Sequence, residues 1–400
     1  MLRSLNMTAI ETDIAIIGAG IIGASCAYHC AKRGLKVAIF DAEVPAAGTS
    51  GACDGYVAVS SKKPGLMMEL ALASKRLYPQ LVRELPRDVE YIDSGGMLLV
   101  EHEADMDKIA AHVAALTAMG VPMEFLDRQR MLALEPNLSP SLHGAWRCPI
   151  EAIVNPYLMT LGLIDGAVAG GARTFWQTRP RGFDLAGSRI VAMDTDAGRV
   201  RAEQFVFAAG VWSEALGRQV GIALPVIPRR GELVVTARGA ALARHYLMSA
   251  QYLIAKGDPE AAKTSSDPRV RLGHGFALEV NAHGQCIVGS TRAFVGHDRS
   301  VTAEGIAVIL SEAIRRLPAL ANVPILRVFA GLRPYVDDKR PIIGRSSAVR
   351  NLLVAAGHEG DGICLSAITG NLIADLATGR TPAIDITALS PDRFMPVHAA

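Results

Sequence analysis

The sequence predicts an α/β fold in which a Rossmann-like nucleotide-binding unit is joined to a separate antiparallel sheet. A buried strand, a glycine-rich turn and a helix follow one another across residues 13–33, which is how such a unit begins. The chain has 400 residues, enough for two domains. Apolar runs with helical spacing lie at 65–85, 103–119, 158–170, 302–317 and 362–378, and strand-like runs cluster at 231–236, 251–255, 275–281 and 285–290.

The composition is that of a soluble globular protein, with 50% hydrophobic and 20% charged residues. Because 41 lysines and arginines nearly balance 39 aspartates and glutamates, the chain does not suit a nucleic-acid binder that works by neutralising many phosphates. Its 6 cysteines form no CxxC pair, so neither a disulfide framework nor a zinc or iron–sulfur clamp is expected. A reducing cytoplasm is the expected location.

Residues 14–31 contain no Asp, Glu, Lys or Arg, and this run approaches the length of a membrane-spanning helix. Its composition argues against that role. Glycines interrupt it near its start, and Glu11 and Asp13 precede it, whereas a signal peptide would begin with basic residues. We therefore expect this run to lie in the core of the nucleotide-binding unit.

The first predicted strand covers residues 13–17, and Gly18-Ala19-Gly20-Ile21-Ile22-Gly23 follows it. A helix at 24–33 and a strand at 36–40 come next, and Asp41 ends the second strand. This is the GxGxxG pattern in its structural context, which favours a dinucleotide site over a chance glycine-rich turn.

Each part of the motif has a physical role. Gly18 allows the tight turn, Gly20 lets a pyrophosphate approach the backbone, and Gly23 lets the helix pack closely on the strand. The phosphate charge would then meet the N–H groups at the start of the helix. Asp41 is placed to accept hydrogen bonds from an adenosine ribose.

The motif alone does not separate NAD from FAD. The sequence has no second GxGxxG, and residues 204–213 form a late buried strand that runs into a turn of small residues. That segment resembles the Ala-Ala-Gly segment of two-domain FAD amine oxidoreductases.

Seven further motifs are spread along nearly the whole chain. Because of these motifs and their order, the sequence resembles the D-amino acid oxidase family of flavoproteins. The family includes glycine oxidase, sarcosine oxidase and the flavin subunits of opine oxidase, D-hydroxyproline dehydrogenase and hydrogen cyanide synthase; the last three are the most similar. The motifs are Thr49-Ser50-Gly51-Ala52-Cys53-Asp54-Gly55-Tyr56-Val57, Leu134-Glu135-Pro136, Val154-Asn155-Pro156, Arg230-Gly231-Glu232, Ile287-Val288-Gly289-Ser290-Thr291, Gly331-Leu332-Arg333-Pro334 and Gly357-His358-Glu359-Gly360-Asp361-Gly362-Ile363.

The resemblance implies a FAD-binding domain of the glutathione-reductase type, with an antiparallel β-sheet substrate domain inserted into it. The FAD-binding domain would comprise 1–90, 145–225 and 325–400, and the substrate domain 91–144 and 226–324. The polar, turn-rich residues 257–271 are expected to form a surface excursion between two strands of the second sheet. The residues expected to contact FAD are Gly18, Ala19, Gly20, Ile21, Gly23, Asp41, Thr49, Ser50, Gly55, Pro180, Ala208, Ala209, Gly210, Trp212, Gly331, Gly357, His358, Gly360, Gly362 and Ile363.

Arg333 is the most informative candidate for substrate binding. An arginine at this place can clamp a carboxylate through two parallel hydrogen bonds and so fix an amino acid for hydride transfer to flavin. By resemblance it matches the carboxylate-binding arginine of the family. The alternative is a structural ion pair with Asp337 or Asp338.

Three further side chains are candidate catalytic residues. Tyr252 lies where the family often has a tyrosine that caps the substrate carboxylate, and Tyr56 could line the substrate face of the flavin. His358 precedes the helix whose N–H groups are expected near the pyrimidine end of the flavin. Each has a structural alternative: a packed aromatic ring for the two tyrosines, and a hydrogen-bonded core histidine for His358.

The segment after His358 departs from the simpler oxidases, which carry an aromatic and then a basic residue there. This chain has Glu359 and Gly360, which puts a second positive contact to the substrate in doubt. The pocket could instead accept a secondary amine or a substrate with a cationic arm. Lys62 and Lys63 are expected to be solvated. Cys26, Cys30 and Cys364 are expected to be buried packing residues.

The expected reaction is oxidation of a carbon–nitrogen bond by hydride transfer to FAD, followed by hydrolysis of the imine. Opines, D-hydroxyproline or other proline-like amines, sarcosine-like amines and glycine remain open as substrates, with glycine ranked lower. Alternatives are a flavin-bearing electron-relay or structural subunit and an NAD-dependent dehydrogenase. The resemblance implies partner subunits with a second nucleotide site and an iron–sulfur cluster, in some cases with FMN between subunits, and it leaves open membrane association through those partners.

Overall fold

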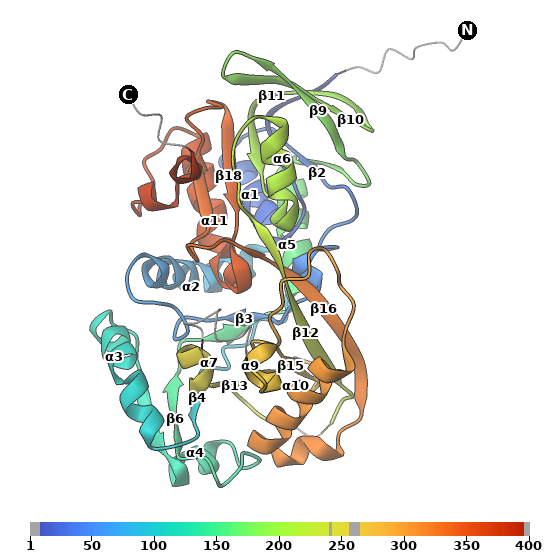
Figure 1. The fold of residues 1–400 in the computed structure, drawn as a ribbon. Helices are drawn as coiled ribbons and strands as arrows, with labels where there is room; N and C mark the ends of the chain where they lie inside the picture. Colours follow the sequence, from blue (N-terminus) through green and yellow to red (C-terminus); the bar gives the residue numbers. More distant parts are fainter. Residues whose placement is uncertain (1–8, 240–241, 256–264, 396–400) are drawn as a thin grey trace.

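The computed structural model describes residues 9–239, 242–255 and 265–395, which fold into two large sheets surrounded by helices. The first sheet lies in the upper half of Figure 1 and the second in the lower half. The expected combination of a Rossmann-like unit with a second sheet is confirmed.

The first sheet has the strand order β17-β18-β11-β1-β2-β8, in which β18 to β8 run parallel and β17 is antiparallel to β18. The short strands β2 and β18 are buried along their whole length, as expected for parallel strands covered on both faces. The bounds are β1 Ile10–Ile17, β2 Val37–Phe40, β8 Arg173–Phe175, β11 Gly198–Phe207, β17 Ile342–Arg345 and β18 Leu352–Ala356.

Four long helices share a core with one face of this sheet. They are α1 Ile21–Lys32, α2 Leu66–Glu84, α5 Pro156–Ala169 and α11 Gly362–Ala377. In α1 every residue except Ile22 and Lys32 is buried. The uncharged run at 14–31 is therefore core, because it supplies most of β1 and α1. Within the part of the chain that the structure describes, no helix is both long and apolar enough to cross a bilayer.

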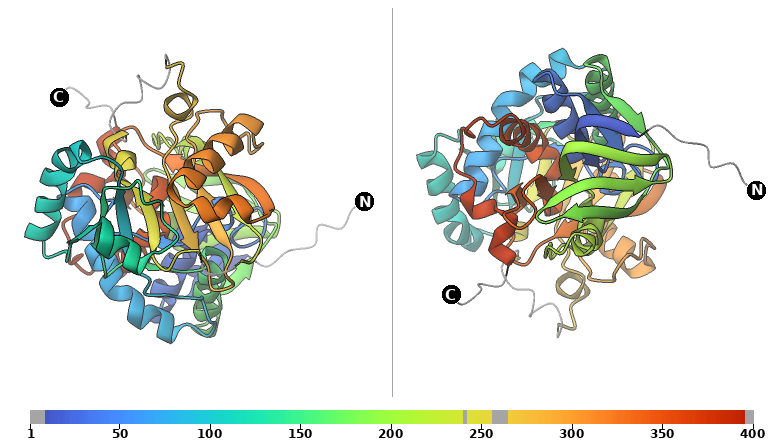
Figure 2. Two further views of the ribbon diagram at one scale, coloured as in Figure 1. Left: turned by 90° about the horizontal axis from the view of Figure 1, so that it is seen from below. Right: turned by 90° about the horizontal axis from the view of Figure 1, so that it is seen from above.

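On the opposite face of the first sheet, the core is completed by a short helix and by a hairpin that belongs to the same sheet, since β10 pairs antiparallel with β11. The view from above in Figure 2 shows the hairpin in green beside the blue first strand. The hairpin consists of β9 Pro180–Ala186 and β10 Arg189–Thr195, and the helix is α6 Ser213–Gln219.

The second sheet has the order β16-β12-β15-β14-β13-β4-β6-β5. Helix α10 Ala303–Arg316 packs on it, while α3 Ala104–Ala118 and α4 Arg128–Leu134 connect its strands on the other side of the lower half. The bounds are β4 Gly96–Val100, β5 Glu124–Asp127, β6 Gly144–Cys148, β12 Ile227–Thr236, β13 Tyr246–Ser249, β14 Ala277–Val280, β15 Cys286–Gly289 and β16 Ile325–Tyr335. A small additional sheet pairs β3 Tyr56–Val57 with β7 Ala152–Ile153.

The second sheet was expected to be antiparallel, and it is mixed. Its neighbours are antiparallel except for β13 and β4, which pair in parallel from Tyr246↔Gly96 to Ser249↔Leu99. These two strands belong to two separate excursions of the chain from the first sheet. Whether β13 and β4 pair in parallel depends on how the two excursions meet in space. Hydrophobic periodicity does not encode this relation. At the other edge, β16 pairs with β12 along its length, so the residues just after 325 belong to this sheet.

The helices expected at 65–85, 103–119, 158–170, 302–317 and 362–378 are confirmed as α2, α3, α5, α10 and α11. The strand expected at 251–255 is wrong, because these residues form α7 Ala250–Ala255. The strand ends just before, at Ser249, whose hydroxyl accepts a hydrogen bond from Gln251 N–H and turns the backbone into the helix. Of the expected surface excursion at 257–271, residues 256–264 lie outside the described residues, and Pro268–Arg271 forms the short helix α9.

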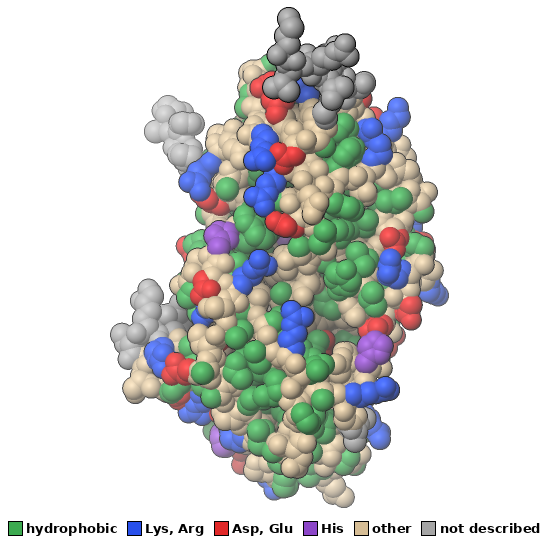
Figure 3. Space-filling model, turned by 90° about the vertical axis from the view of Figure 1, so that its right-hand side faces the viewer, with side chains coloured by type: hydrophobic (Ala, Val, Ile, Leu, Met, Phe, Trp, Pro, Cys, Tyr) green, Lys and Arg blue, Asp and Glu red, His purple; other side chains and the backbone are tan. Residues whose placement is uncertain are grey.

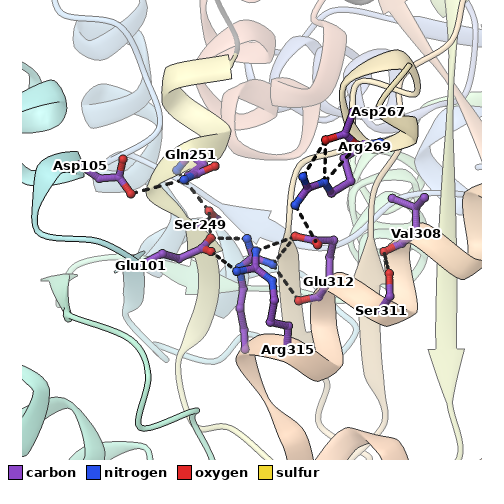
Figure 4. Close-up of polar contacts among 11 residues, drawn as sticks. Glu101, Asp105, Ser249, Gln251, Asp267, Arg269, Val308, Ser311, Glu312 and Arg315 are labelled. Atoms are coloured by element: carbon purple, nitrogen blue, oxygen red, sulfur yellow. Dashed lines mark hydrogen bonds and ion pairs between the residues drawn. The ribbon is translucent and has the colours of Figure 1, made fainter. Parts of the chain in front are cut away.

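Ion pairs tie α10 to the middle of the second sheet, as Figure 4 shows. Glu101, just after β4, accepts hydrogen bonds from Arg316, from Ser249 at 3.2 Å, and pairs with Arg315 at 2.6 Å. Arg316 also pairs with Glu312 at 2.8 Å. The side chains of Glu101 and Arg316 are each only 4% exposed, so these charges stabilise one another away from water.

Hydrophobic side chains gather on the face of the molecule shown in Figure 3, on the side where β12 and β16 lie in Figure 1. Exposed hydrophobic residues of these strands are Ile227 at one end of the β12–β16 pair and Ile325 and Leu326 at the other, and Phe294 and Val295 are exposed in the loop after β15.

Candidate active site

One cavity of about 530 Å³ lies between the first and second sheets. The start of α1, the ends of β2, β11 and β18, and strands of the second sheet contribute to its walls. Three short 3₁₀ turns also line it, namely η1 Thr49–Gly51, η2 Gly210–Trp212 and η4 Glu359–Asp361. The sequence-predicted residues that line this cavity are Gly18, Gly20, Ile21, Asp41, Thr49, Ser50, Tyr56, Pro180, Ala208, Ala209, Gly210, Trp212, Gly331, Arg333, Gly357, His358, Gly360, Gly362 and Ile363.

Three residues expected at the cofactor lie behind the cavity wall. Ala19 is fully buried, and its N–H donates to Asp41 Oδ2 at 2.6 Å. A Cβ on Gly23 would be 1.9 Å from the carbonyl oxygen of Gly18, so Gly23 brings α1 against β1. A Cβ on Gly55 would be 1.7 Å from the carbonyl oxygen of Val154, so Gly55 serves close packing.

The glycine-rich turn leaves its backbone open to the cavity. Gly18 has φ +113°, and a Cβ there would be 2.4 Å from the carbonyl oxygen of Ala208. Gly20 precedes α1, whose first turn is apolar, and the N–H of Ile21 donates to Ser50 Oγ at 2.9 Å. The positive end of the α1 dipole therefore faces the cavity without an acidic side chain from that turn.

Asp41 stands at the end of β2, at the same edge of the parallel sheet. Its two carboxylate oxygens accept the N–H groups of Ala19 and Glu43, at 2.6 and 2.8 Å. Burial raises the pKa of Asp41, while these two hydrogen bonds act in the opposite direction. The carboxylate is thus fixed in orientation at the cavity wall.

The start of α11 forms another part of the wall. His358 is buried, its Nε2 lies 3.0 Å from Thr369 Oγ1, and burial lowers its pKa to about 4. The imidazole is therefore neutral at pH 7. Lys62 reaches this region and pairs with Asp361 at 2.8 Å. The expectation that Lys62 is solvated is wrong, since its side chain is only 2% exposed, whereas Lys63 is exposed.

Arg333 lies on β16 at the junction of the two sheets, and its side chain is 17% exposed. Its Nη2 donates to Ser290 Oγ at 2.6 Å and its Nη1 to the carbonyl oxygen of Thr291 at 3.0 Å. Asp338, one of its two alternative partners, pairs with Arg340 and Arg393. The guanidinium is therefore held at the cavity wall by the two residues that follow β15.

Glu359 supplies a carboxylate beside this arginine. It accepts a hydrogen bond from Arg229, and its Oε1 lies 4.0 Å from Arg333 Nε. The guanidinium of Arg229 lies 4.6 Å from the ring centroid of Tyr335. The residue directly after the buried histidine is therefore a carboxylate that is already paired with Arg229.

Tyr56 and Tyr246 form a stacked pair at the end of the cavity made by the second sheet, with ring centroids 3.4 Å apart. The hydroxyl of Tyr56 donates to Glu151, a fully buried carboxylate that also accepts the N–H groups of Val59 and Ser60. Burial raises the pKa of Glu151. Tyr56 therefore presents its ring to the cavity while its hydroxyl is held from behind.

The side chain of Tyr252, the remaining catalytic candidate, lies outside the described residues. Sequence reasoning missed Tyr246, whose hydroxyl donates to Asp54 at 2.7 Å, and it missed Asp54 itself. Asp54 belongs to the motif at residues 49–57 that supports the family resemblance. Its acidic side chain could therefore have been recognised from the sequence as a candidate site residue. The pairing of Tyr246 with Tyr56 had no signal in the sequence, because it joins strands from two distant segments.

The described residues hold no group of three or more His, Cys, Asp or Glu side chains arranged to bind a metal ion. Cys26, Cys30 and Cys364 are buried, as expected, and burial raises the pKa of each thiol. The cavity thus offers a helix N-terminus and a fixed carboxylate at one end and an arginine with stacked aromatic rings at the other.

Comparisons with known proteins agree with this arrangement. A family model described as FAD dependent oxidoreductase matches residues 13–376. Hydrogen cyanide synthase subunit HcnC of Pseudomonas protegens is 30% identical, with 96% of each chain covered, and glycine oxidase of Geobacillus kaustophilus is 29% identical, with 96% of this chain and 97% of that protein covered. The crystal structure of glycine oxidase from Geobacillus kaustophilus superposes with a TM-score of 0.86 at 27% identity, covering 97% of this chain and 100% of that one.

Proposed function

Since the chain belongs to the family of FAD dependent oxidoreductases, we propose that it oxidises the carbon–nitrogen bond of an amino acid or an N-substituted amino acid. The flavin, when bound, accepts the hydride from the substrate carbon. The protein's part is to bind the substrate, orient its C–H bond and exclude water.

The residues of the cavity fit FAD. Glycines keep the turn before α1 free of side chains, and the helix dipole there suits a pyrophosphate. Asp41 would hold the adenosine ribose, and the small residues Ala208 and Ala209 leave room beside it. The N-terminal end of α11 would stabilise negative charge at its end of the cavity. The other proposed contacts are the cavity-lining residues predicted from the sequence.

Arg333 is the observation that carries the proposal. Its guanidinium stands at the cavity wall, fixed by Ser290 and Thr291, and can receive a substrate carboxylate. A carboxylate held there places the neighbouring C–N bond within the same cavity. The imine product would then leave and hydrolyse in water.

Opines and D-hydroxyproline or related amines are our proposed substrates, because Glu359 and Gly360 replace the aromatic and the basic residue that the simpler oxidases carry after this histidine, so a second positive contact to the substrate is missing there. We also propose that the chain acts as the catalytic subunit of a heteromeric complex, with an iron–sulfur cluster in a partner and FMN at a subunit interface. One relative is named as a subunit of hydrogen cyanide synthase, and the apolar face of β12 and β16 is suited to a partner.

The test is anaerobic reduction of the bound flavin by octopine, nopaline, cis- and trans-4-hydroxy-D-proline, D-proline, sarcosine and glycine. We expect the opines or the hydroxyprolines to bleach the flavin absorbance fastest. Arg333→Ala should keep FAD bound and lower kcat/KM at least about 100-fold, and Arg333→Lys should recover only part of the loss, because lysine lacks the bidentate fork.

Arg327→Ala is the matched control, since Arg327 lies on the same strand but is exposed and away from the cavity. Its kinetics should equal those of the wild type. Unchanged kinetics in Arg333→Ala would instead favour a flavin-bearing relay or structural subunit. Full turnover of the isolated chain with oxygen, at the rate of the native assembly, would remove the case for partners.

A further inference from the structure

The cavity contains a second charged group that the proposed reaction leaves unused. Asp54, between η1 and β3, contributes its carboxylate to the cavity wall. It accepts a hydrogen bond from Tyr246 at 2.7 Å, which fixes its orientation. Across residues 9–239, 242–255 and 265–395, no Lys, Arg or His nitrogen lies within 4.0 Å of this carboxylate. An anionic group thus faces the cavity without a protein counter-ion from those residues.

A second carboxylate lies behind the first. Glu279 of β14 is buried, and its Oε2 accepts the N–H of Gly55 at 2.8 Å. Burial and the nearby charge of Asp54 raise the pKa of Glu279 well above its ordinary value. A cation bound at Asp54 would offset this repulsion, so its binding and the ionisation of Glu279 favour each other.

Asp54 and Arg333 act on one region of the site. Burial raises the pKa of the Cys53 thiol, Asp54 and Glu279 raise it further, and Arg333 lowers it. The carboxylate and the guanidinium therefore both lie near Cys53, and all three residues line the same cavity. The second sheet also contributes side chains with apolar surface to the wall of this cavity, namely Leu233, Tyr246, Met248 and Ala277.

We propose that the substrate carries a second cationic group, separate from the reacting amine, and that Asp54 binds it. The inference rests on the proposed function and narrows it to amino acids or N-substituted amino acids with a cationic arm, such as an ammonium or guanidinium group. Arg333 receives the carboxylate, the aliphatic part of the arm lies along the apolar wall, and Asp54 receives its charged end.

The reacting nitrogen itself is a poor partner for Asp54. Hydride leaves the neighbouring carbon only when that nitrogen has a free lone pair, so the amine must be neutral at that moment. Two carboxylates beside it would favour its protonated form. A cation that stays charged throughout the reaction gains from Asp54 in every state of the substrate.

Binding of unreactive probes tests the inference without turnover. Two series of probes are titrated separately into the FAD-loaded protein by calorimetry: straight-chain carboxylates of four to six carbons, and ω-amino carboxylates of the same lengths. The affinities of the two series are then compared. We expect the best ω-amino carboxylate to bind about 10-fold to 100-fold more tightly than its uncharged counterpart, as a charged hydrogen bond in a partly buried site would give. Asp54→Asn should abolish that difference, because the amide can still accept from Tyr246 but carries no charge.

Asp107→Asn is the control variant, since Asp107 is exposed on α3, away from the cavity, and loses the same charge. The difference between the two probe series should persist in it. A second readout compares kcat/KM for octopine with kcat/KM for an analogue whose guanidinium is replaced by a urea. We expect the wild type to favour octopine and Asp54→Asn to show similar values for the two substrates.

Equal affinity of the two probe series in the wild type overturns the inference while leaving the carboxylate site intact. An equal fall of kcat/KM in Asp54→Asn for charged and uncharged arms also overturns it, and assigns Asp54 to the reacting amine. A different result would contradict the proposed function itself: no carboxylate-bearing amine bleaches the flavin, and neither probe series binds. The inference, which rests on that function, would then be wrong as well.

Discussion

Arg333 owes its position to a glycine on the neighbouring strand. In the pairing of β12 with β16, Gly231 lies opposite Gly331, and Arg229 lies opposite Arg333. A Cβ on Gly231 would be 2.2 Å from Nη1 of Arg333 and 2.5 Å from its Cζ. The space beside Gly231 is therefore filled by the guanidinium, and a larger residue would have to displace it.

Gly231→Ala should reproduce much of the effect of Arg333→Ala. We expect kcat/KM to fall by at least about 10-fold with FAD content unchanged, because the methyl group moves the guanidinium off its bonds to Ser290 and Thr291. Gly182→Ala is the control, since no atom lies within 4 Å of a Cβ added at Gly182 of β9. Wild-type kinetics in Gly231→Ala would show that the arginine position does not limit the reaction.

Single residues could be predicted from the sequence where a local pattern fixes their place. Asp41 follows from the strand that it ends, and Arg333 from its motif; both line the cavity. Lys62 could not be predicted, because its burial depends on Asp361, 299 positions away in the chain. The role of Tyr246 could not be predicted for the same reason, since its partner Tyr56 lies on a strand of a different sheet.

Among the elements, α10 depends on buried charges for its attachment to the second sheet. Glu101 is its main anchor, since it pairs with both Arg315 and Arg316. Removing one member of such a group leaves the others buried with incomplete compensation.

Glu101→Gln should lower the free energy of unfolding by about 3 kcal/mol, measured by urea denaturation, because Arg316 then keeps only Glu312 as an anionic partner within the described chain. Glu304→Gln is the matched control. It breaks another Glu–Arg contact of α10, the one with Arg271, whose side chains are 47% and 43% exposed, and it should cost less than about 1 kcal/mol. If both variants lost the same free energy of unfolding, burial of the Glu101 ion pairs would contribute nothing beyond an exposed ion pair.

The helices were the elements best predicted by the sequence, because their apolar stripes persist over several turns. Short strands were harder. The segment at 251–255 has a strand-like composition but forms α7, since Ser249 turns the backbone just before it. The strands β4, β5 and β6 were not predicted, because runs of four or five residues carry too little periodicity to separate a strand from a loop.

For the molecule as a whole, buried histidines make stability depend on pH. Burial lowers the pKa of His29 to about 3 and those of His274 and His358 to about 4. In the unfolded chain these groups bind protons near pH 6.5, so between pH 6.5 and 4 the unfolded state binds more protons than the folded state. Stability therefore falls as the pH is lowered through this range.

His274 gives the cleanest measure of this effect, because neither ring nitrogen finds a hydrogen-bond partner among the described residues. Wild-type protein should lose about 2 kcal/mol of stability through His274 between pH 7 and pH 5. Urea denaturation of His274→Leu at both pH values should show a loss smaller by that amount. His102→Asn changes an exposed histidine and should keep the wild-type difference. Identical pH dependence in His274→Leu and wild type would contradict the assignment.

At this scale the family motifs and the glycine-rich turn were enough to predict the α/β architecture and the second sheet. The parallel pairing of β13 with β4 was beyond reach, because it reflects how two excursions of the chain meet in space. The likeness to the glycine oxidase structure extends over 97% of the chain, so the whole arrangement belongs to the family and not to one motif.

The order of strands in the first sheet has a consequence for biosynthesis. β1 pairs with β11, which in turn pairs with β18, and Ser25 of α1 donates to the carbonyl oxygen of Ser366, 341 positions later. While the ribosome is still making the middle of the protein, β1 has an unpaired edge and α1 has no α11 to cover it. The nascent chain must therefore keep apolar surface from aggregating until its last strands emerge, and the cavity walls supplied by β18 and α11 are complete only after that point.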